Sequence, residues 1–425
     1  MATTRYKLYP YRWVVLAAFT FVNLTIQTLW ISYAPITGPA AQFYEATDLQ
    51  IGLLSMAFMI AFIPLSIPVS WVIDTHGFKI AVGIGVVLMG VFGILRGLAG
   101  ANYVLVLWST IGLAAAQPFL LNAWTKVPAN WFATEERATA VGIVTLGNLV
   151  GTALGLALTP VLFETMSIPT IQLIYGWIAA FSAVLFLIFA RENPPTPPCP
   201  PGGEVRALML DGLKHAFTVK AFWFAILVSF IGLGIFNGIT TWIENIIRPR
   251  GFSPTDAGTL GALMIAGGLI GAIVIPSLSD KQHKRQLYLY VAFLGAIPGL
   301  MGLTFATTPT LLFASAFVLG FFLVSAMPIV MQYASEVTQP TPEGTSNGLI
   351  QLFGQASVVF VYIMEALKST DGSFTPALVL ALVLLVLSVI FVSQMKDPKD
   401  LNARNSSRKK AGGAPGKDTR KPSRA

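Results

Sequence analysis

Long uncharged apolar stretches recur along the whole chain. Twelve of them are separated by Pro, Gly or charged residues: 12–36, 49–73, 79–99, 102–124, 137–162, 169–190, 221–247, 256–279, 286–306, 309–333, 344–367 and 374–395. Each is long enough to cross the roughly 30 Å apolar core of a bilayer as an α-helix. Strands of a membrane barrel would alternate polar and apolar side chains, and these stretches do not. The pattern predicts an all-α membrane protein with twelve transmembrane helices.

A proline-rich segment divides the predicted helices into two sets of six. It reads RENPPTPPCPPGGEVRALMLDGLKHAFTVK, residues 191–220, and its first half has no capacity for a core of its own. The predicted organisation is an N-terminal lobe over 1–190, a cytoplasmic linker over 191–220, a C-terminal lobe over 221–395 and a basic tail over 396–425. The tail is polar and poor in apolar residues, so disorder is expected there.

Composition and charge agree with a membrane protein and orient it. The chain is 55% hydrophobic and 11% charged, and its formal net charge is +8. If the N-terminus lies inside, only four of the 27 Lys and Arg residues fall in outer segments, namely Arg96, Arg248, Arg250 and Lys368. The positive-inside rule then places both termini in the cytoplasm. Topology explains the basic balance, so no nucleic-acid partner is expected, and the cell membrane is the predicted location.

Catalytic and metal-binding constellations are missing from the sequence. The three histidines, His76, His215 and His283, fall in predicted cytoplasmic loops, and no zinc-protease, serine-hydrolase or phosphate-loop motif occurs. The single cysteine, Cys199, excludes a disulfide framework and a thiolate metal site. The prediction is a protein that is not an enzyme and needs no metal or cofactor.

Ionisable residues within the predicted helices would indicate ion coupling, because each is costly in a bilayer. The candidates lie near helix ends, where a side chain that snorkels to the interface is the simpler interpretation: Arg96, Lys126, Glu244 and Glu365. Transport down the solute's own gradient is therefore the simpler expectation. Proton coupling stays an alternative, with Glu244 or Glu365 as the residues that would carry it.

Uncharged polar residues form stripes on several predicted helices. At 100° per residue, Thr20, Asn23, Gln27 and Trp30 share one face of the first helix, which argues against Trp30 as a lipid-facing anchor. Similar clusters are Gln117, Leu121 and Trp124 on the fourth helix, Asn237, Thr240, Thr241 and Glu244 on the seventh, and Gln351 and Gln355 on the eleventh. Interhelical hydrogen bonds would explain any single residue. Four stripes together favour a shared solute cavity. Gly147, Gly151 and Gly155 predict a close packing seam.

The two halves repeat one another. SWVIDTHGFK follows the second helix and IPSLSDKQHKR follows the eighth, and each places an acid before basic residues. Glu136 precedes Gly147 by eleven residues, as Glu343 precedes Gly354, and a polar amide follows each glycine: Asn148 in the first half and Gln355 in the second. The chain thus resembles the major facilitator superfamily, whose fold is two pseudo-symmetric six-helix lobes. Of that superfamily's loop motif, Asp74, Gly77 and Lys79 match, while the leading glycine and both arginines do not. The resemblance implies a gating role for Asp74, Gly77, Lys79, Asp280 and Glu343; an ordinary helix end with a tight glycine turn is the alternative.

A narrower resemblance covers the first to the twelfth helix. The stretches AQPFLLNAWTKVPANWF, VSWVIDTHGF and SEVTQPTPEGTSNGLIQLFGQ are similar to the family of the feline leukaemia virus subgroup C receptor. That family is linked to choline and ethanolamine uniport, haem transport is also claimed for it, and a more distant member is linked to pyridoxine. The resemblance implies an aromatic cage with two amides. It assigns Trp30, followed by Tyr33, and Gln355 to the cage, and it departs at Leu149 and Asn237, where the family has glutamine and tyrosine.

The sequence thus predicts facilitative uniport of a choline- or ethanolamine-like amine by alternating access. Its expected ligands are Trp30, Gln355 and Asn237, with Gln27, Asn148, Gln117, Trp124 and Tyr33 around them. A different metabolite, such as a vitamin or a haem-like tetrapyrrole, and a sensor that binds without transporting are the alternatives. A monomer in the lipid bilayer, with a small-molecule substrate as its partner, is expected.

Overall fold

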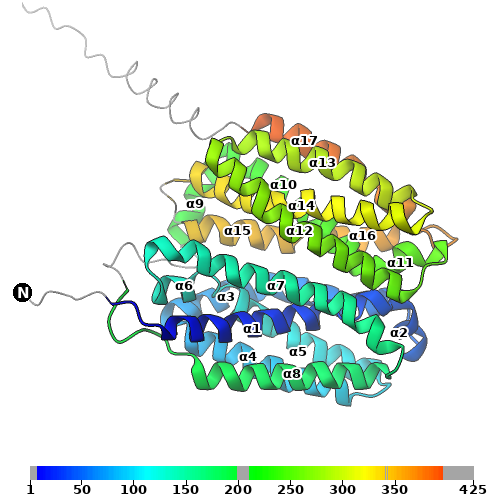
Figure 1. The fold of residues 1–425 in the computed structure, drawn as a ribbon, viewed down its shortest axis with the longest axis horizontal. Helices are drawn as coiled ribbons and strands as arrows, with labels where there is room; N and C mark the ends of the chain where they lie inside the picture. Colours follow the sequence, from blue (N-terminus) through cyan, green and yellow to red (C-terminus); the bar gives the residue numbers. More distant parts are fainter. Residues whose placement is uncertain (1–6, 199–209, 340, 342, 396–425) are drawn as a thin grey trace, which may run out of the picture.

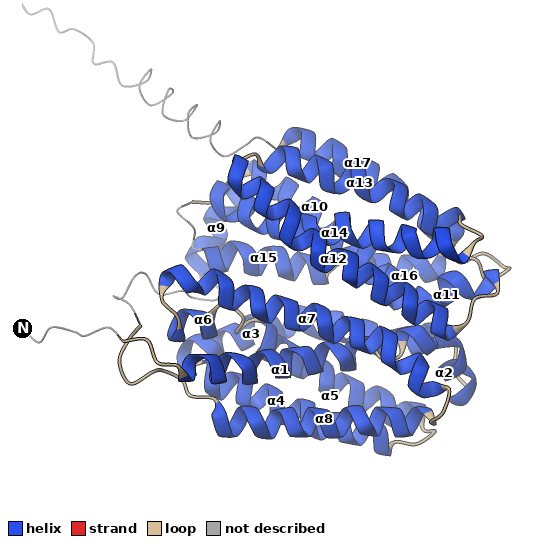
Figure 2. Cartoon of the chain, viewed as in Figure 1, coloured by secondary structure: helices blue, strands red, loops and turns tan. Residues whose placement is uncertain are grey.

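The computed structural model describes residues 7–198, 210–339, 341 and 343–395 (Figure 1). All regular structure in these residues is helical (Figure 2), and twelve of the helical segments are long and apolar enough to cross a bilayer. The predicted fold class is therefore confirmed. The predicted basic tail, 396–425, lies outside the described residues.

The helices fall into two groups that occupy separate halves of the molecule (Figure 1). The first group, here the N-lobe, comprises α1 (Tyr11–Ile31), η1 (Ala34–Ile36), α2 (Thr37–Phe43), α3 (Asp48–His76), α4 (Phe78–Leu98), α5 (Tyr103–Leu121), α6 (Lys126–Trp131), α7 (Thr134–Phe163) and α8 (Ile168–Phe189). The second, the C-lobe, comprises α10 (Lys220–Thr241), α11 (Ile243–Ile247), η2 (Arg248–Arg250), α12 (Pro254–Gln282), α13 (Arg285–Phe305), α14 (Pro309–Val337), α15 (Glu343–Gln355), α16 (Val358–Ala366) and α17 (Thr375–Gln394). The short α9 (Leu210–Thr218) precedes the C-lobe.

The two ends of the helical bundle differ in what they contain. One end, here the linker end, holds the start of α1 and the short helix α9; the opposite end, the far end, holds α2 and α11 (Figure 1). The positive-inside rule predicts that the linker end faces the cytoplasm.

The N-lobe is held together by a glycine seam between α1 and α7. A Cβ on Gly151 would meet the Leu24 carbonyl of α1, and one on Gly155 would meet the backbone of Thr28. Thr28 Oγ1 donates across the seam to the Gly151 carbonyl over 2.9 Å. Backbones approach this closely only where small residues leave room, so the predicted packing seam is confirmed.

Four transmembrane segments are broken where the sequence predicts continuous helices. The first changes from α1 to η1 after Ile31, the fourth from α5 to α6 after Leu121, the seventh from α10 to α11 at Trp242, and the eleventh from α15 to α16 after Gln355. Apolar length does not mark most of these breaks, because Tyr11–Phe43, Tyr103–Trp131 and Thr345–Ala366 each still qualify as one continuous span by length and hydropathy. A break leaves backbone groups outside the regular hydrogen-bond ladder, and in a membrane such backbone must be enclosed by protein or line a cavity.

Candidate functional site

The polar stripe of helix 1 lies inside the protein. Trp30 is only 7% exposed, whereas Trp13 on the same helix is 44% exposed. The indole Nε1 of Trp30 donates to the Ser55 carbonyl of α3 over 3.2 Å, and Ser55 Oγ donates back to the Trp30 carbonyl over 3.2 Å. Trp30 is thus fixed against α3 by two bonds and does not act as a lipid-facing anchor. Its contact with a solute stays a prediction.

The amides on this stripe present oxygen atoms without a partner. Asn23 is fully buried and donates its Nδ2 to the Phe19 carbonyl over 2.9 Å, while its Oδ1 accepts no hydrogen bond. The Oε1 atom of Gln27, one turn further along α1, is also buried and unpaired. Since an unsatisfied buried acceptor costs about 1–3 kcal/mol, both oxygens are suited to a hydrogen-bond donor supplied from outside the chain.

Two further predicted ligands on neighbouring helices share this property. Gln117 on α5 and Asn148 on α7 are each 4% exposed, and the side-chain oxygen of each accepts no hydrogen bond. Asn148 donates its Nδ2 to the Val144 carbonyl over 3.1 Å and adjoins Gly147 of the seam with α1. Asn237, 6% exposed, supplies a buried amide from α10 of the C-lobe. Three N-lobe helices therefore carry buried acceptor oxygens.

Gln355, Trp124 and Tyr33 have surroundings that the helical angles do not predict. Gln355 is the last residue of α15, directly before the break in the eleventh segment. Trp124 follows the end of α5, so the stripe with Gln117 that assumed one continuous helix is wrong; its Nε1 donates to the Val141 carbonyl over 3.3 Å. Tyr33 belongs to a separate cluster near the far end, where its hydroxyl lies 3.0 Å from that of Tyr44.

The helix breaks were not predicted from the sequence, which indicated continuous helices. Ser357 lies at the break beside Gln355, is fully buried, and has an Oγ without a partner. At the break in the seventh segment, Trp242 is fully buried, donates its Nε1 to the Val361 carbonyl over 2.9 Å, and packs its ring against Gly52 of the N-lobe. Broken helices are common at transporter binding sites. Gly354 directly precedes Gln355 at the break in the eleventh segment, whereas the neighbours of Trp242, Thr241 and Ile243, include no Gly or Pro.

The predicted gating residues of the N-lobe surround the turn between α3 and α4. Lys126 Nζ lies 3.7 Å from Asp74 Oδ1. Gly77 has φ +85°, and a Cβ there would collide with the Glu192 carboxylate. That carboxylate accepts hydrogen bonds from the backbone amides of Phe78, over 3.1 Å, and Lys79, over 2.7 Å. Gly77 is therefore required by the turn and by Glu192.

In the C-lobe, Asp280 pairs with Arg285, which also binds Glu336 at 2.9 Å. The contacts described for Asp74 and Asp280 each lie within one lobe, and Lys79 contacts Glu192, which follows α8 of the N-lobe. A gating function of these residues stays a prediction. Glu343 begins α15, and its side chain lies outside the described residues.

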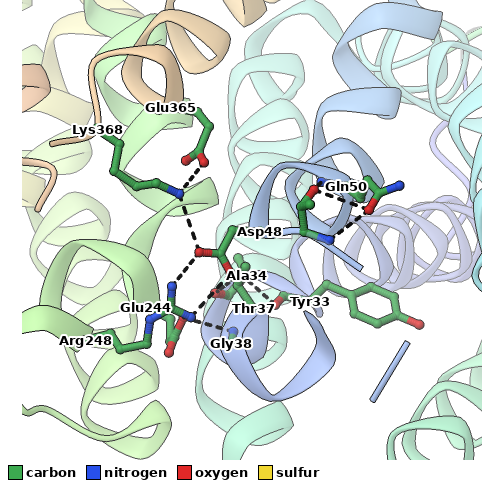
Figure 3. Close-up of polar contacts among 11 residues, drawn as sticks. Tyr33, Ala34, Thr37, Gly38, Asp48, Gln50, Glu244, Arg248, Glu365 and Lys368 are labelled. Carbon is green, nitrogen blue, oxygen red and sulfur yellow. Dashed lines mark hydrogen bonds and ion pairs between the residues drawn. The ribbon is translucent and has the colours of Figure 1, made fainter. Parts of the chain in front are cut away.

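An ion cluster joins the two lobes at the far end (Figure 3). The sequence did not predict that these residues lie together. Asp48, at the start of α3, lies between two C-lobe cations: its Oδ2 is 2.5 Å from Arg248 Nη2 and 3.6 Å from Lys368 Nζ. Lys368 also pairs with Glu365. The sequence signals for this cluster are that Arg248 and Lys368 are among the few outer basic residues, and that Glu244 and Glu365 are ionisable residues near the ends of predicted helices.

Glu244 adds a second link between the lobes in this cluster. It accepts a hydrogen bond from the Gly38 amide of α2 over 3.1 Å and lies 3.4 Å from Arg248. The expectation that Glu244 snorkels to the interface is wrong, because its side chain is 3% exposed and bound by protein groups. The cluster closes the far end with charged contacts.

Close apolar packing reinforces this closure. A Cβ on Gly258, in the first turns of α12, would meet Pro160 and the Leu156 carbonyl near the end of α7. Figure 1 shows α7 and α12 side by side along this boundary. The contacts of Gly52 with Trp242 lie at the same end. Removal of the far-end closure therefore requires both ion pairs and packed glycine contacts to separate.

A two-lobed bundle with uncharged polar side chains in its interior and a closure between the lobes at one end has the architecture of a membrane carrier. A family model described as Major Facilitator Superfamily matches residues 14–362 and 252–421. The chain belongs to this superfamily and is a multi-pass membrane transporter of its type.

Similar proteins place the chain near the family that the sequence resembles, within this superfamily. The chain is 28% identical over 405 residues to choline/ethanolamine transporter FLVCR1 of Mus terricolor, over 86% of this chain and 71% of that protein. It is 29% identical over 391 residues to solute carrier family 49 member A3 of Xenopus tropicalis, over 88% of this chain and 81% of that protein. The predicted resemblance to this family is confirmed.

Solved structures agree on the fold. A bacterial homologue of the human lysosomal transporter Spinster, in an inward-facing and unoccupied conformation, matches with a TM-score of 0.73 at 16% identity, over 91% of this chain and 97% of that one. The nucleoside transporter NupG matches with a TM-score of 0.67 at 13% identity, over 90% and 99% of the two chains. At these identities the likeness concerns the fold alone.

Proposed function

We propose that this transporter moves a choline- or ethanolamine-like amine down its gradient by alternating access between the two lobes. The observation that carries the proposal is the set of buried, unpaired amide oxygens around helix 1: Asn23 Oδ1, Gln27 Oε1, Gln117 Oε1 and Asn148 Oδ1. These are acceptors, and they suit a solute that donates from a hydroxyl or an ammonium group. Two similar proteins, both named choline/ethanolamine transporter FLVCR1, support the same chemistry.

Trp30 supplies the aromatic face for the cationic end of the solute. A ring placed face-on to an ammonium group contributes about 0.5–2 kcal/mol. Asn237 stands where the resemblance implies a second ring, so hydrogen bonds replace part of the cage in this chain. Gln355, at the break in the eleventh segment, completes the proposed site from the C-lobe.

Uniport is proposed because the buried acids are engaged elsewhere. Glu244 and Glu365 are bound at the far end by Arg248 and Lys368. Within the described ranges, no Asp, Glu or His is hydrogen-bonded to the buried amides. On the basis of the positive-inside rule, we also propose that the far end faces outward and that both termini are cytoplasmic.

Uptake of labelled choline and ethanolamine into liposomes that contain the purified protein tests this function. We expect Trp30→Ala to reduce uptake about tenfold, which corresponds to about 1.4 kcal/mol, within the range for the loss of one ring face. Trp108→Ala is the matched control, because Trp108 is 64% exposed on α5 and faces outward from the bundle. Equal uptake by wild type and Trp30→Ala, or no uptake by either, would refute the substrate assignment. Dependence of uptake on an imposed pH gradient would refute uniport.

A further inference from the structure

Arg96 is a buried cation in a transmembrane helix of the N-lobe. It lies in the last turn of α4 and is 1% exposed, so the expectation that it snorkels to the interface is wrong. A charged side chain at this depth is costly unless protein groups replace its water. The burial of Arg96 therefore calls for protein groups that replace its water and for a reason to keep a charge at this position.

Neutral groups surround the guanidinium. Its Nη1 donates to the Leu29 carbonyl over 3.1 Å, its Nη2 donates to Ser32 Oγ over 3.3 Å, and its Cζ lies 5.4 Å from the centre of the Tyr33 ring. Among the residues that the structure describes, Arg96 has no ion pair with a carboxylate. A structural ion pair is thus not the reason for its burial.

The three groups that Arg96 contacts all belong to the end of helix 1. Leu29 is among the last four residues of α1, whose carbonyls lack partners in a regular helix end. Ser32 also donates to the Leu29 carbonyl over 3.2 Å and lies 3.4 Å from Gln172 of α8. Arg96 therefore binds the break in the first transmembrane segment directly.

Trp30 is held on two sides, by the contact of Arg96 with Leu29 and by the hydrogen bonds to Ser55 of α3. The preceding residue, Leu29, is held by Arg96, and Trp30 itself is held through its carbonyl and its indole by Ser55. The two attachments come from different helices, α4 and α3. Together they determine the rotation of the last turn of α1, and with it the direction of the Trp30 ring.

We infer that Arg96 is a positioning residue for Trp30: it orients the ring through the Leu29 carbonyl and Ser32 and does not touch the solute. The contact of Trp30 with the solute belongs to the proposed function, on which this role rests. A guanidinium is suited to the task because its planar fork donates to two acceptors while its face lies against a ring. A lysine ammonium keeps the charge and loses this geometry.

Arg96→Lys is the test variant, and Arg250→Lys is its matched control. Arg250 also donates from a guanidinium to a backbone carbonyl, that of Ala306 over 3.0 Å, but in the C-lobe. In protein labelled with fluorotryptophan, the resonance of Trp30 among the nine tryptophans is assigned by its loss in Trp30→Phe. We expect Arg96→Lys to shift this resonance and Arg250→Lys to leave it unchanged.

Transport kinetics give the second readout. We expect Arg96→Lys to raise the KM for the transported amine about tenfold, comparable to the loss of one ring face, with kcat nearly unchanged. In a Trp30→Ala background the same substitution should have little further effect on KM, because residues that act as a unit are not additive. A folding defect would instead lower the melting temperature and add its effect in both backgrounds.

The outcomes separate this role from the proposed function. An unshifted Trp30 resonance in Arg96→Lys, or an equal shift in Arg250→Lys, overturns the positioning role whatever the solute is. An additive effect on KM in the Trp30→Ala background overturns it as well. If Arg96→Lys shifts the resonance and Trp30→Ala transports normally, Arg96 orients Trp30 as inferred, and the proposed solute site is the part that fails.

Discussion

Asp48→Asn is the sharpest perturbation of the far-end ion cluster, because this one carboxylate bridges the lobes through two cations. It lies 2.5 Å from Arg248 and 3.6 Å from Lys368. Asparagine keeps the size of the side chain in the first turn of α3 and removes its charge. The only change expected at the interface is therefore the loss of two ion pairs.

The exposure of the side chains sets the magnitude. Asp48 is 17% exposed, Arg248 40% and Lys368 25%, so both pairs lie closer to the exposed case, worth up to about 1 kcal/mol each, than to a fully buried one. Their combined loss is about 1.4 kcal/mol, which corresponds to a tenfold change in an equilibrium constant. We expect the ratio of far-end-open to far-end-closed molecules to rise about tenfold.

A distance measurement between spin labels in the two lobes checks this expectation. Since the chain has one cysteine, Cys199→Ser provides a cysteine-free background. Labels at Ala101→Cys and Thr307→Cys occupy exposed loops at the far end, one in each lobe. The long-distance population should grow in Asp48→Asn.

Glu45→Gln is the matched control, because Glu45 is an exposed carboxylate near the same helix start. An unchanged distance distribution in Asp48→Asn would refute the reasoning. So would an equal change in Glu45→Gln, since the effect would then come from net charge and not from the bridge between lobes.

Two further predictions concern helix packing and the turn after α3. Gly151→Ala should lower the unfolding free energy by about 1–3 kcal/mol, because the added Cβ meets the fixed Leu24 backbone carbonyl. Thermal unfolding measures this loss. Gly142→Ala is the control and should not destabilise the protein, because nothing lies within 4 Å of a Cβ at that position. Glu192→Gln should speed hydrogen exchange of the backbone amides of Phe78 and Lys79, because both amides lose a charged acceptor. Unchanged exchange rates would contradict the role of the Glu192 carboxylate in holding this turn.

Helical angles predicted the interior stripe only as far as each helix stays continuous. Asn23, Gln27 and Trp30 precede the break in helix 1. Asn23 and Trp30 are buried, and Gln27 is partly buried. Trp124 and Glu244 lie beyond breaks, and the 100° rotation per residue no longer applies there. Polar residues beside the breaks, such as Asn122 and Gln355, do not distinguish them, since Asn148 lies within the continuous helix α7.

What the sequence by itself determined is the set of properties that the bilayer imposes on each segment separately. The number of spans follows from apolar length, because every backbone group in lipid must be paired within its own helix. The seam of Gly147, Gly151 and Gly155 follows from a spacing that places small residues on one face.

Only the tertiary structure decided which groups meet. Arg248 and Asp48 are 200 residues apart in sequence and 2.5 Å apart in space, and no local pattern encodes that distance. Arg96 reads as a residue at a helix end, yet its guanidinium points inward because Leu29, Ser32 and Tyr33 replace its water. In a membrane, a polar side chain goes wherever neighbouring helices offer partners, and those partners are set by the packing of both lobes.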